Sequence, residues 1–218
     1  LVALREGVLM SEAHSFSVTA RGAGGHGAIA GTAGNVLLAV AALAGELGLV
    51  VDGMATDGTA CACSAGMLRA GSAPNVVPSS ASLRGTLRTF TDTQRETALT
   101  ALRAACDGIA DAYACEVELT VHDHAPAVVN ADGPTAVVRR EAAVVLGDDK
   151  VLTVPPVTPS DDVSEFLNRV PGCYFFVGAG RPDGTSGAHH SPAFSLDEGC
   201  LGIAARVLAR SAVSLAAP

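Results

Sequence analysis

The order of extended and helical segments constrains the fold of this chain more than any other feature of its sequence. Polar and apolar residues alternate, as in strands with one buried face, over residues 15–20, 59–68, 82–90 and 115–121. Apolar residues recur at the three- and four-residue spacing of amphipathic helices over residues 34–48 and 93–112. The order strand, helix, strand, strand, helix, strand predicts a ferredoxin-like α+β domain over residues 13–125, with a four-stranded antiparallel sheet and two helices on one face.

The remainder of the chain has a different pattern. Helices are predicted over residues 134–146, 161–168 and 195–215, and short apolar strands over residues 151–154 and 173–177. Helices that alternate with apolar strands are typical of an α/β layer. Two short strands make an incomplete sheet, so we expect residues 126–218 to need a longer parent chain or a partner. Residues 1–12 are predicted to be a linker and the end of a preceding segment of the same α/β domain.

Charge and cysteine usage narrow the functional class. The net charge is -8 and Lys150 is the only lysine, so the chain offers no basic patch for nucleic acid. No Cys-x-x-Cys pair occurs among the six cysteines, which we interpret as buried thiols. No segment is expected to reach the apolar length of a membrane span. We therefore predict a cytoplasmic protein that binds neither nucleic acid nor membrane.

Two histidine pairs raise the question of metal binding. His189 and His190 follow a glycine-rich stretch, but no cluster of carboxylates and histidines precedes them. A catalytic zinc site needs about three protein ligands, so this pair indicates a half-site whose remainder lies elsewhere. His122 and His124 would share one face of a strand, but they lie at the end of a predicted strand, where a structural interpretation is favoured.

Six motifs, in order along the chain, resemble the zinc-dependent aminoacylase and carboxypeptidase family of metallopeptidases. Those of residues 13–125 are FSVTARGAGGHGA at 16–28, GSAPNVVP at 71–78 and LRGTLRTF at 83–90. Those of residues 126–218 are VVN at 128–130, VPGCYFFVGA at 170–179 and HSPAFSLDE at 190–198. They are most similar to the amidohydrolase subgroup that cleaves hippurate and auxin–amino-acid conjugates. Each motif is loose alone, and their shared order makes the resemblance specific.

The resemblance implies a homodimeric hydrolase of N-acyl amino acids or related small amides. Residues 13–125 would be the lid domain, which dimerises, and residues 126–218 the C-terminal portion of an α/β metallohydrolase catalytic domain. In such enzymes two divalent metal ions, Zn²⁺ or Mn²⁺, hold the attacking water, and a carboxylate acts as general base. By position His190 corresponds to a metal ligand, and His26 to the lid histidine that stabilises the oxyanion in the other subunit. Asn75 and Arg88 correspond to substrate-binding residues.

The residue types suit these roles independently of the family. An imidazole on a tight Gly-Gly-His turn can donate to developing negative charge, and an arginine fork fits a carboxylate. The plainer interpretations are that His26 and Asn75 serve turns and that Arg88 is a surface ion-pair partner. The ordered set favours the functional interpretation.

The family's first metal-binding histidine, bridging aspartate and general-base glutamate have no counterpart here, since neither Cys-Gly-His-Asp nor Glu-Glu occurs. We therefore expect this chain alone to be inactive, offering only one metal ligand, with the N-terminal half supplied by another polypeptide or a cleaved piece. Two alternatives stay open: a non-catalytic dimerisation or ligand-binding module derived from the family, and an unrelated α/β protein with coincidental motifs. The joint presence of His26, Arg88 and His190 favours the hydrolase.

Overall fold

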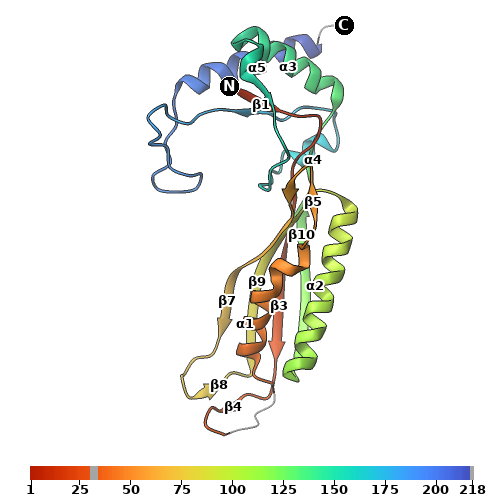
Figure 1. Ribbon diagram of the computed structural model, residues 1–218, viewed down its shortest axis with the longest axis vertical. Coiled ribbons are helices and arrows are strands. Elements are labelled where there is room, and N and C mark those ends of the chain that lie inside the picture. The colour runs from red at the N-terminus through yellow and green to blue at the C-terminus, as the bar shows by residue number, and fades with distance from the viewer. Residues whose placement is uncertain (30–33, 217–218) are drawn as a thin grey trace. The chain divides into compact units, whose positions relative to one another are not determined.

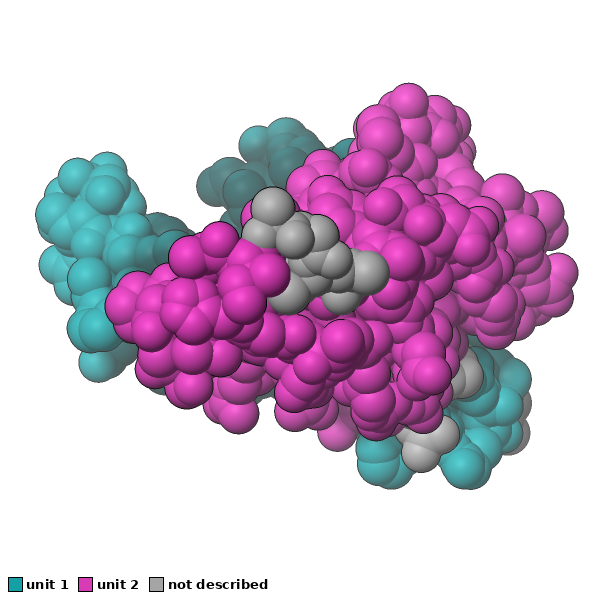
Figure 2. Space-filling model, turned by 90° about the horizontal axis from the view of Figure 1, so that it is seen from below, with its two compact units in different colours: residues 1–9, 128–155, 163–218 teal, residues 10–127, 156–162 magenta. Residues whose placement is uncertain are grey.

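The computed structural model describes residues 1–29 and 34–216, except for the side chains at 123 and 124, and contains two compact units (Figure 1). Unit 1, teal in Figure 2, comprises Leu1–Leu9, Val128–Pro155 and Val163–Pro218. Unit 2, magenta in Figure 2, comprises Met10–Ala127 and Pro156–Asp162. The prediction that residues 126–218 form one portion is thus wrong for residues 156–162. This segment is held in unit 2 because the Ser11 amide donates to the Val157 carbonyl at 3.0 Å and Arg88 Nη1 donates to the Thr158 carbonyl at 3.1 Å.

Unit 2 is built on a four-stranded sheet in the order β10-β3-β9-β7. All three pairings in it are antiparallel. The elements along the chain are β3 (Glu12–Arg21), α1 (Val36–Glu46), η1 (Leu47–Val51), β7 (Ala62–Ala70), β9 (Ser80–Thr89), α2 (Asp92–Tyr113) and β10 (Glu116–Ala125). Two small hairpins join them, one of β4 (Gly25–His26) with β8 (Val76–Val77), the other of β5 (Ala55–Thr56) with β6 (Thr59–Ala60). The order of long elements and the sheet arrangement agree with the sequence prediction.

Alternation along the central strands determines which face of this sheet is covered. Phe16 and Val18 of β3 are buried, whereas the intervening residues are partly or fully exposed. α1 and α2 contact each other and the sheet, and they bury aliphatic faces that include Leu43 and Leu102. Figure 1 shows both helices running alongside the long strands. The opposite face of the sheet is therefore left open.

Local sequence determines where these helices begin. Asn35 Oδ1 accepts from the Leu38 amide at 3.3 Å and caps α1. Thr91 Oγ1 accepts from the Gln94 amide at 3.2 Å and caps α2. Gln94 Oε1 in turn accepts from the amide of Phe90, the residue before the cap, at 3.0 Å.

Unit 1 contains a three-stranded sheet in the order β12-β1-β13. Its sheet strands are β1 (Val2–Leu4), parallel to β12 (Val151–Thr153) and antiparallel to β13 (Phe176–Val177). A second pair joins β2 (Gly7–Met10) to β11 (Val128–Asn130). Its helices are α3 (Asp132–Leu146), η2 (Asp148–Lys150), α4 (Ser164–Leu167) and α5 (Gly199–Ala216). Residues 1–12 were predicted to be a linker and the end of a segment of this α/β domain, and β1 lies in unit 1 as the second part of that prediction states. The strand itself was not predicted, and it supplies the centre of the sheet.

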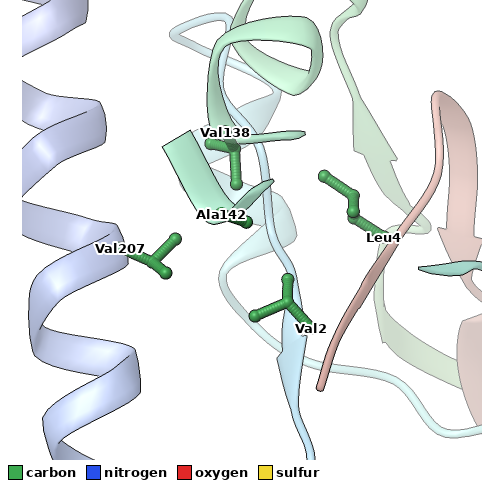
Figure 3. Close-up of a cluster of buried hydrophobic side chains, with 5 residues drawn as sticks. All are labelled: Val2, Leu4, Val138, Ala142 and Val207. Atoms are coloured by element: carbon green, nitrogen blue, oxygen red, sulfur yellow. The ribbon is translucent and has the colours of Figure 1, made fainter. Parts of the chain in front are cut away.

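The core of unit 1 lies between β1, α3 and α5. Val2 and Leu4 of β1 meet Val138 and Ala142 of α3 and Val207 of α5 (Figure 3). All five side chains are buried, which fixes both helices against one strand.

α5 is the most apolar helix at the surface of this unit. Within the part of the chain that the structure describes, it is the one helix whose 18 residues and mean hydropathy of 1.4 would suffice to cross a membrane, and 17% of it is buried. The expectation that no segment reaches this length is therefore wrong by length and composition. The alanine-rich pattern around Arg206 and Arg210 concealed it.

Candidate functional site

His26 and Asn75, predicted to act on the substrate, lie side by side at one end of the unit 2 sheet. The pairing of β4 with β8 places His26 opposite Val76, and the Gly27 amide donates to the Asn75 carbonyl at 2.9 Å. Gly24 precedes this hairpin with φ of +64°, and a Cβ there would lie 3.0 Å from the Val77 carbonyl oxygen, so glycine is needed for the close approach. Figure 1 shows β4 and β8 together at this end.

The hydrogen bond to His26 determines which ring nitrogen carries its proton. Nδ1 accepts from the Ala28 amide at 3.1 Å. In the neutral ring the proton is consequently on Nε2, which makes Nε2 a donor. The side chain is exposed, so this N–H is free to meet a ligand.

Asn75 has the geometry of a turn residue with an available side chain. It lies in the turn that precedes β8 and is exposed. Its carbonyl holds Gly27, whereas its side-chain amide has no hydrogen-bond partner among the described residues. Asn75 can therefore serve both as a turn residue and as a substrate-binding residue. Its backbone carbonyl holds the turn, and its side-chain amide is available to a ligand.

Arg88 lies far from His26 and Asn75 within the same unit. It is the penultimate residue of β9, whereas the β4–β8 hairpin adjoins Ser80 at the start of that strand, a separation of about 26 Å at roughly 3.3 Å per residue. Its Nη1 donates to the Thr158 carbonyl at 3.1 Å and to Ser160 Oγ at 3.2 Å. It pairs with no carboxylate among the described residues, contrary to the ion-pair interpretation. One chain therefore does not bring all three residues together.

His190 lies in unit 1, in an exposed turn with unusual backbone geometry. Its φ is +64°, a left-handed conformation that non-glycine residues rarely adopt. Hydrogen bonds from Ser191 to Ala188 at 3.1 Å and from Gly187 to Ala193 at 3.1 Å hold the turn. The ring centroids of His189 and Phe194 lie 4.9 Å apart, so the exposed His189 ring contacts Phe194.

The described residues provide no complete metal site. No group of three or more His, Cys, Asp or Glu side chains among them is placed to hold an ion. Of the second histidine pair, His122 Nε2 lies 3.1 Å from Ser17 Oγ, and the side chain of His124 lies outside the described residues. The cysteines behave largely as predicted, since four of the six are buried and none forms a disulfide. Burial raises the pKa of Cys63 and Cys106 to about 11, which keeps both thiols protonated.

A buried ionic cluster near the start of β3 was not predicted. Glu12 accepts hydrogen bonds from Thr89 Oγ1 and, at 3.2 Å, from Arg95 Nη1, and lies 3.7 Å from His14 Nε2. Arg95 also contacts Asp92 at 2.6 Å. The sequence did contain one indication of it. Glu12 and His14 occupy even-numbered positions, like Phe16 and Val18, and so belong to the same face of the strand. The cluster anchors the start of α2 to the sheet.

Comparison with known proteins identifies the family. Residues 21–214 match the model of peptidase family M20/M25/M40. The chain is 30% identical over 212 residues to a Bacillus subtilis N-acetylcysteine deacetylase, covering 97% of this chain and 54% of that protein. It is 30% identical over 205 residues to a Lacticaseibacillus casei N-acetyldiaminopimelate deacetylase, covering 92% and 51%. The chain thus spans about half the length of these curated relatives.

Two solved structures are similar to this chain over nearly its whole length. A Bacillus subtilis protein described as a dinuclear metal-binding peptidase of the M20 family is 25% identical, with a TM-score of 0.74 over 98% of this chain and 52% of its own. A putative aminohydrolase from methicillin-resistant Staphylococcus aureus shares the fold, with a TM-score of 0.80 at 23% identity over 98% of this chain and 55% of its own. The resemblance predicted from the six motifs is confirmed, and an unrelated α/β protein is excluded.

Proposed function

Because the chain belongs to peptidase family M20/M25/M40, we propose that it is part of a metal-dependent amidohydrolase that cleaves N-acyl amino acids or related small amides. One observation carries the proposal: the family match spans residues 21–214, which include His26, Asn75, Arg88 and His190. The relatives named as deacetylases of N-acetylcysteine and N-acetyldiaminopimelate supply the substrate class, a small N-acylated amino acid. Retention of these four residues argues against the non-catalytic alternative.

His26 acts on the reacting carbonyl in this proposal. Amide hydrolysis passes through a tetrahedral oxyanion, which needs a donor aimed at it. Because Nδ1 is occupied by the Ala28 amide at 3.1 Å, the exposed Nε2–H is the donor offered. In the predicted assembly it reaches the site of the other subunit.

Asn75 and Arg88 bind the substrate. The Asn75 amide orients the acylated amino acid through hydrogen bonds, from its position beside His26. Arg88 uses one nitrogen, Nη1, to hold Thr158 and Ser160, and its remaining donors bind the substrate carboxylate. Since the two residues lie at opposite ends of the sheet, we assign them to different subunits' sites in a dimer.

The residues that the structure describes do not by themselves fit two divalent ions, Zn²⁺ or Mn²⁺. His190 offers one imidazole, and the described residues supply no second and third ligand beside it. We propose that His190 completes a site whose other ligands lie in the part of the catalytic domain that residues 1–218 do not include.

Exposed apolar surface on unit 1 supports such a complementary part. α5 exposes Leu201, Leu208 and Val213, and α3 exposes Val144, each by more than half of its surface. Patches of this kind mark interaction surfaces. Arg210 of α5 lies 2.8 Å from the buried Glu141 carboxylate, and such a charge mid-helix favours a protein neighbour over lipid. We accordingly propose a cytoplasmic protein, without membrane or nucleic-acid partners.

The lid is proposed to form a homodimer through unit 2. β7 lies at the edge of the sheet and pairs only with β9. It exposes Met67 and Leu68 by 39% and 44%. An unpaired edge with apolar side chains is suited to pairing with a second copy.

A direct assay tests the proposed activity. The protein is purified from its own cells under native conditions, and fractions are assayed with Zn²⁺ or Mn²⁺ for release of free amino acids from a panel of N-acetyl amino acids. We expect hydrolysis to elute with this chain. Hydrolysis that elutes apart from the chain would contradict the proposal.

A further inference from the structure

The open face of the unit 2 sheet carries a polar cluster that the proposed function does not use. Ser17 of β3 lies directly opposite Arg84 of β9 in the antiparallel register. Ser17 Oγ is 3.1 Å from His122 Nε2 of β10. Side chains opposite each other on one sheet face have Cβ atoms about 5 Å apart, so the three groups are neighbours across three adjacent strands.

The charge of Arg84 is not balanced within this surface. Arg84 makes no ion pair or hydrogen bond with any residue that the structure describes. The nearby Glu118 is already paired with Arg21 at 2.9 Å, and Met67 is the neighbour of Arg84 on β7. Arg69, on the same face, likewise has no ion pair among the described residues. Arg84 differs from it in lying opposite Ser17 and its hydrogen-bonded partner His122.

We propose that Arg84, Ser17 and His122 form a binding site for the carboxylate of a small ligand. The guanidinium presents two parallel N–H donors to the carboxylate oxygens. When His122 Nε2–H donates to Ser17 Oγ, the Ser17 hydroxyl is left to donate to the same carboxylate. The site is separate from His26 and Asn75, and it holds whether or not the chain forms a hydrolase, because it uses no residue of that machinery.

Nuclear magnetic resonance titration of the full 218-residue chain tests this site. Sodium acetate is the probe, with acetamide as the neutral isostere and sodium chloride at equal ionic strength as the salt control. We expect saturable shifts of the backbone amides of Ser17, Arg84 and His122 with acetate alone. The expected dissociation constant is on the order of 10 mM, since exposed carboxylate–guanidinium pairs bind weakly. Equal shifts with sodium chloride would overturn the site.

Matched variants locate the binding. Arg84→Gln should weaken acetate binding at least tenfold, and Ser17→Ala several-fold. Arg69→Gln, on β7 of the same face, should leave it unchanged. Unchanged binding in Arg84→Gln, or equal loss in Arg69→Gln, would refute the assignment. If Arg84→Gln does not fold, the test uses Ser17→Ala alone, and unchanged acetate binding in that variant would refute the assignment.

A comparison of two further ligands distinguishes a small metabolite from a peptide C-terminus as the source of the carboxylate. N-acetylglycine represents a small metabolite and triglycine a peptide C-terminus. We expect N-acetylglycine to bind at least as well as triglycine. Binding of triglycine alone would overturn the assignment to a small ligand.

Discussion

At the scale of single residues, backbone geometry sets the chemistry of both predicted histidines. The Ala28 amide fixes the His26 proton on Nε2, and a left-handed turn with φ of +64° presents His190. Strained backbone of this kind persists where its surroundings enforce it. The two histidines should therefore respond differently to removal.

His26→Ala should slow amide hydrolysis by about 10²–10³-fold without loss of metal, because it removes one oxyanion donor and no ligand. The measurement is the turnover number and the metal content of the assembled enzyme. Loss of metal in this variant would refute the oxyanion role.

His190→Ala should lower the metal content, whereas His189→Ala, in which the lost ring packs on Phe194 at 4.9 Å, should retain it. Elemental analysis of the assembled protein gives the comparison. Equal metal in both variants would show that His190 is not a ligand.

At the scale of elements, Gly85 shows how one position of a motif serves packing. A Cβ at Gly85 of β9 would lie 2.5 Å from the Phe16 ring and also meet the Ser64 carbonyl. The glycine in the LRGTLRTF motif is therefore required, because the Phe16 ring occupies the space beside β9 that a side chain at position 85 would need.

Gly85→Ala should destabilise unit 2 by about 1–3 kcal/mol, the usual effect of overpacking. Gly66→Ala on β7 is the control, since nothing lies within 4 Å of a Cβ there. Urea unfolding compares the two free energies of unfolding, and equal values would contradict the packing role.

The Glu141 carboxylate joins α3 to α5. Hydrogen bonds from Ser214, and then from Arg210 and Arg140, hold the pKa of Glu141 below its ordinary value. A lowered folded-state pKa means that this contribution is complete above the ordinary value of about 4.3 and is lost as the pH falls through the lowered pKa.

Glu141→Gln should consequently lower the melting temperature at neutral pH, and the difference from the wild type should shrink below about pH 4. Glu165→Gln, which removes an exposed pair with Arg169, should change it little. A difference that is independent of pH would contradict the ionic role of Glu141.

Sequence periodicity predicted the elements of unit 2 because each strand buries one face and each helix one stripe. It could not predict that β1 forms the central strand of the unit 1 sheet or that residues 156–162 return to unit 2, since both depend on contacts remote in sequence. Likewise, His26 and Asn75 were named from motifs, but their adjacency arises from the β4–β8 pairing. Arg84 was missed because its significance depends on the strand register.

At the scale of the whole molecule, the chain corresponds to about half of each deacetylase relative. Its exposed apolar helices and its single predicted metal ligand are both explained if a complementary catalytic half packs against unit 1. The proposed hydrolysis therefore requires that half in the functional protein.

Elemental analysis of the natively purified protein, together with an assay on N-acetyl amino acids, tests the proposed metal-dependent hydrolysis. We predict bound zinc or manganese, and hydrolysis that is lost when a chelator removes the metal and restored when the metal is returned. Hydrolysis that persists in the metal-free protein, or a purified protein that binds neither zinc nor manganese, would contradict the proposed function.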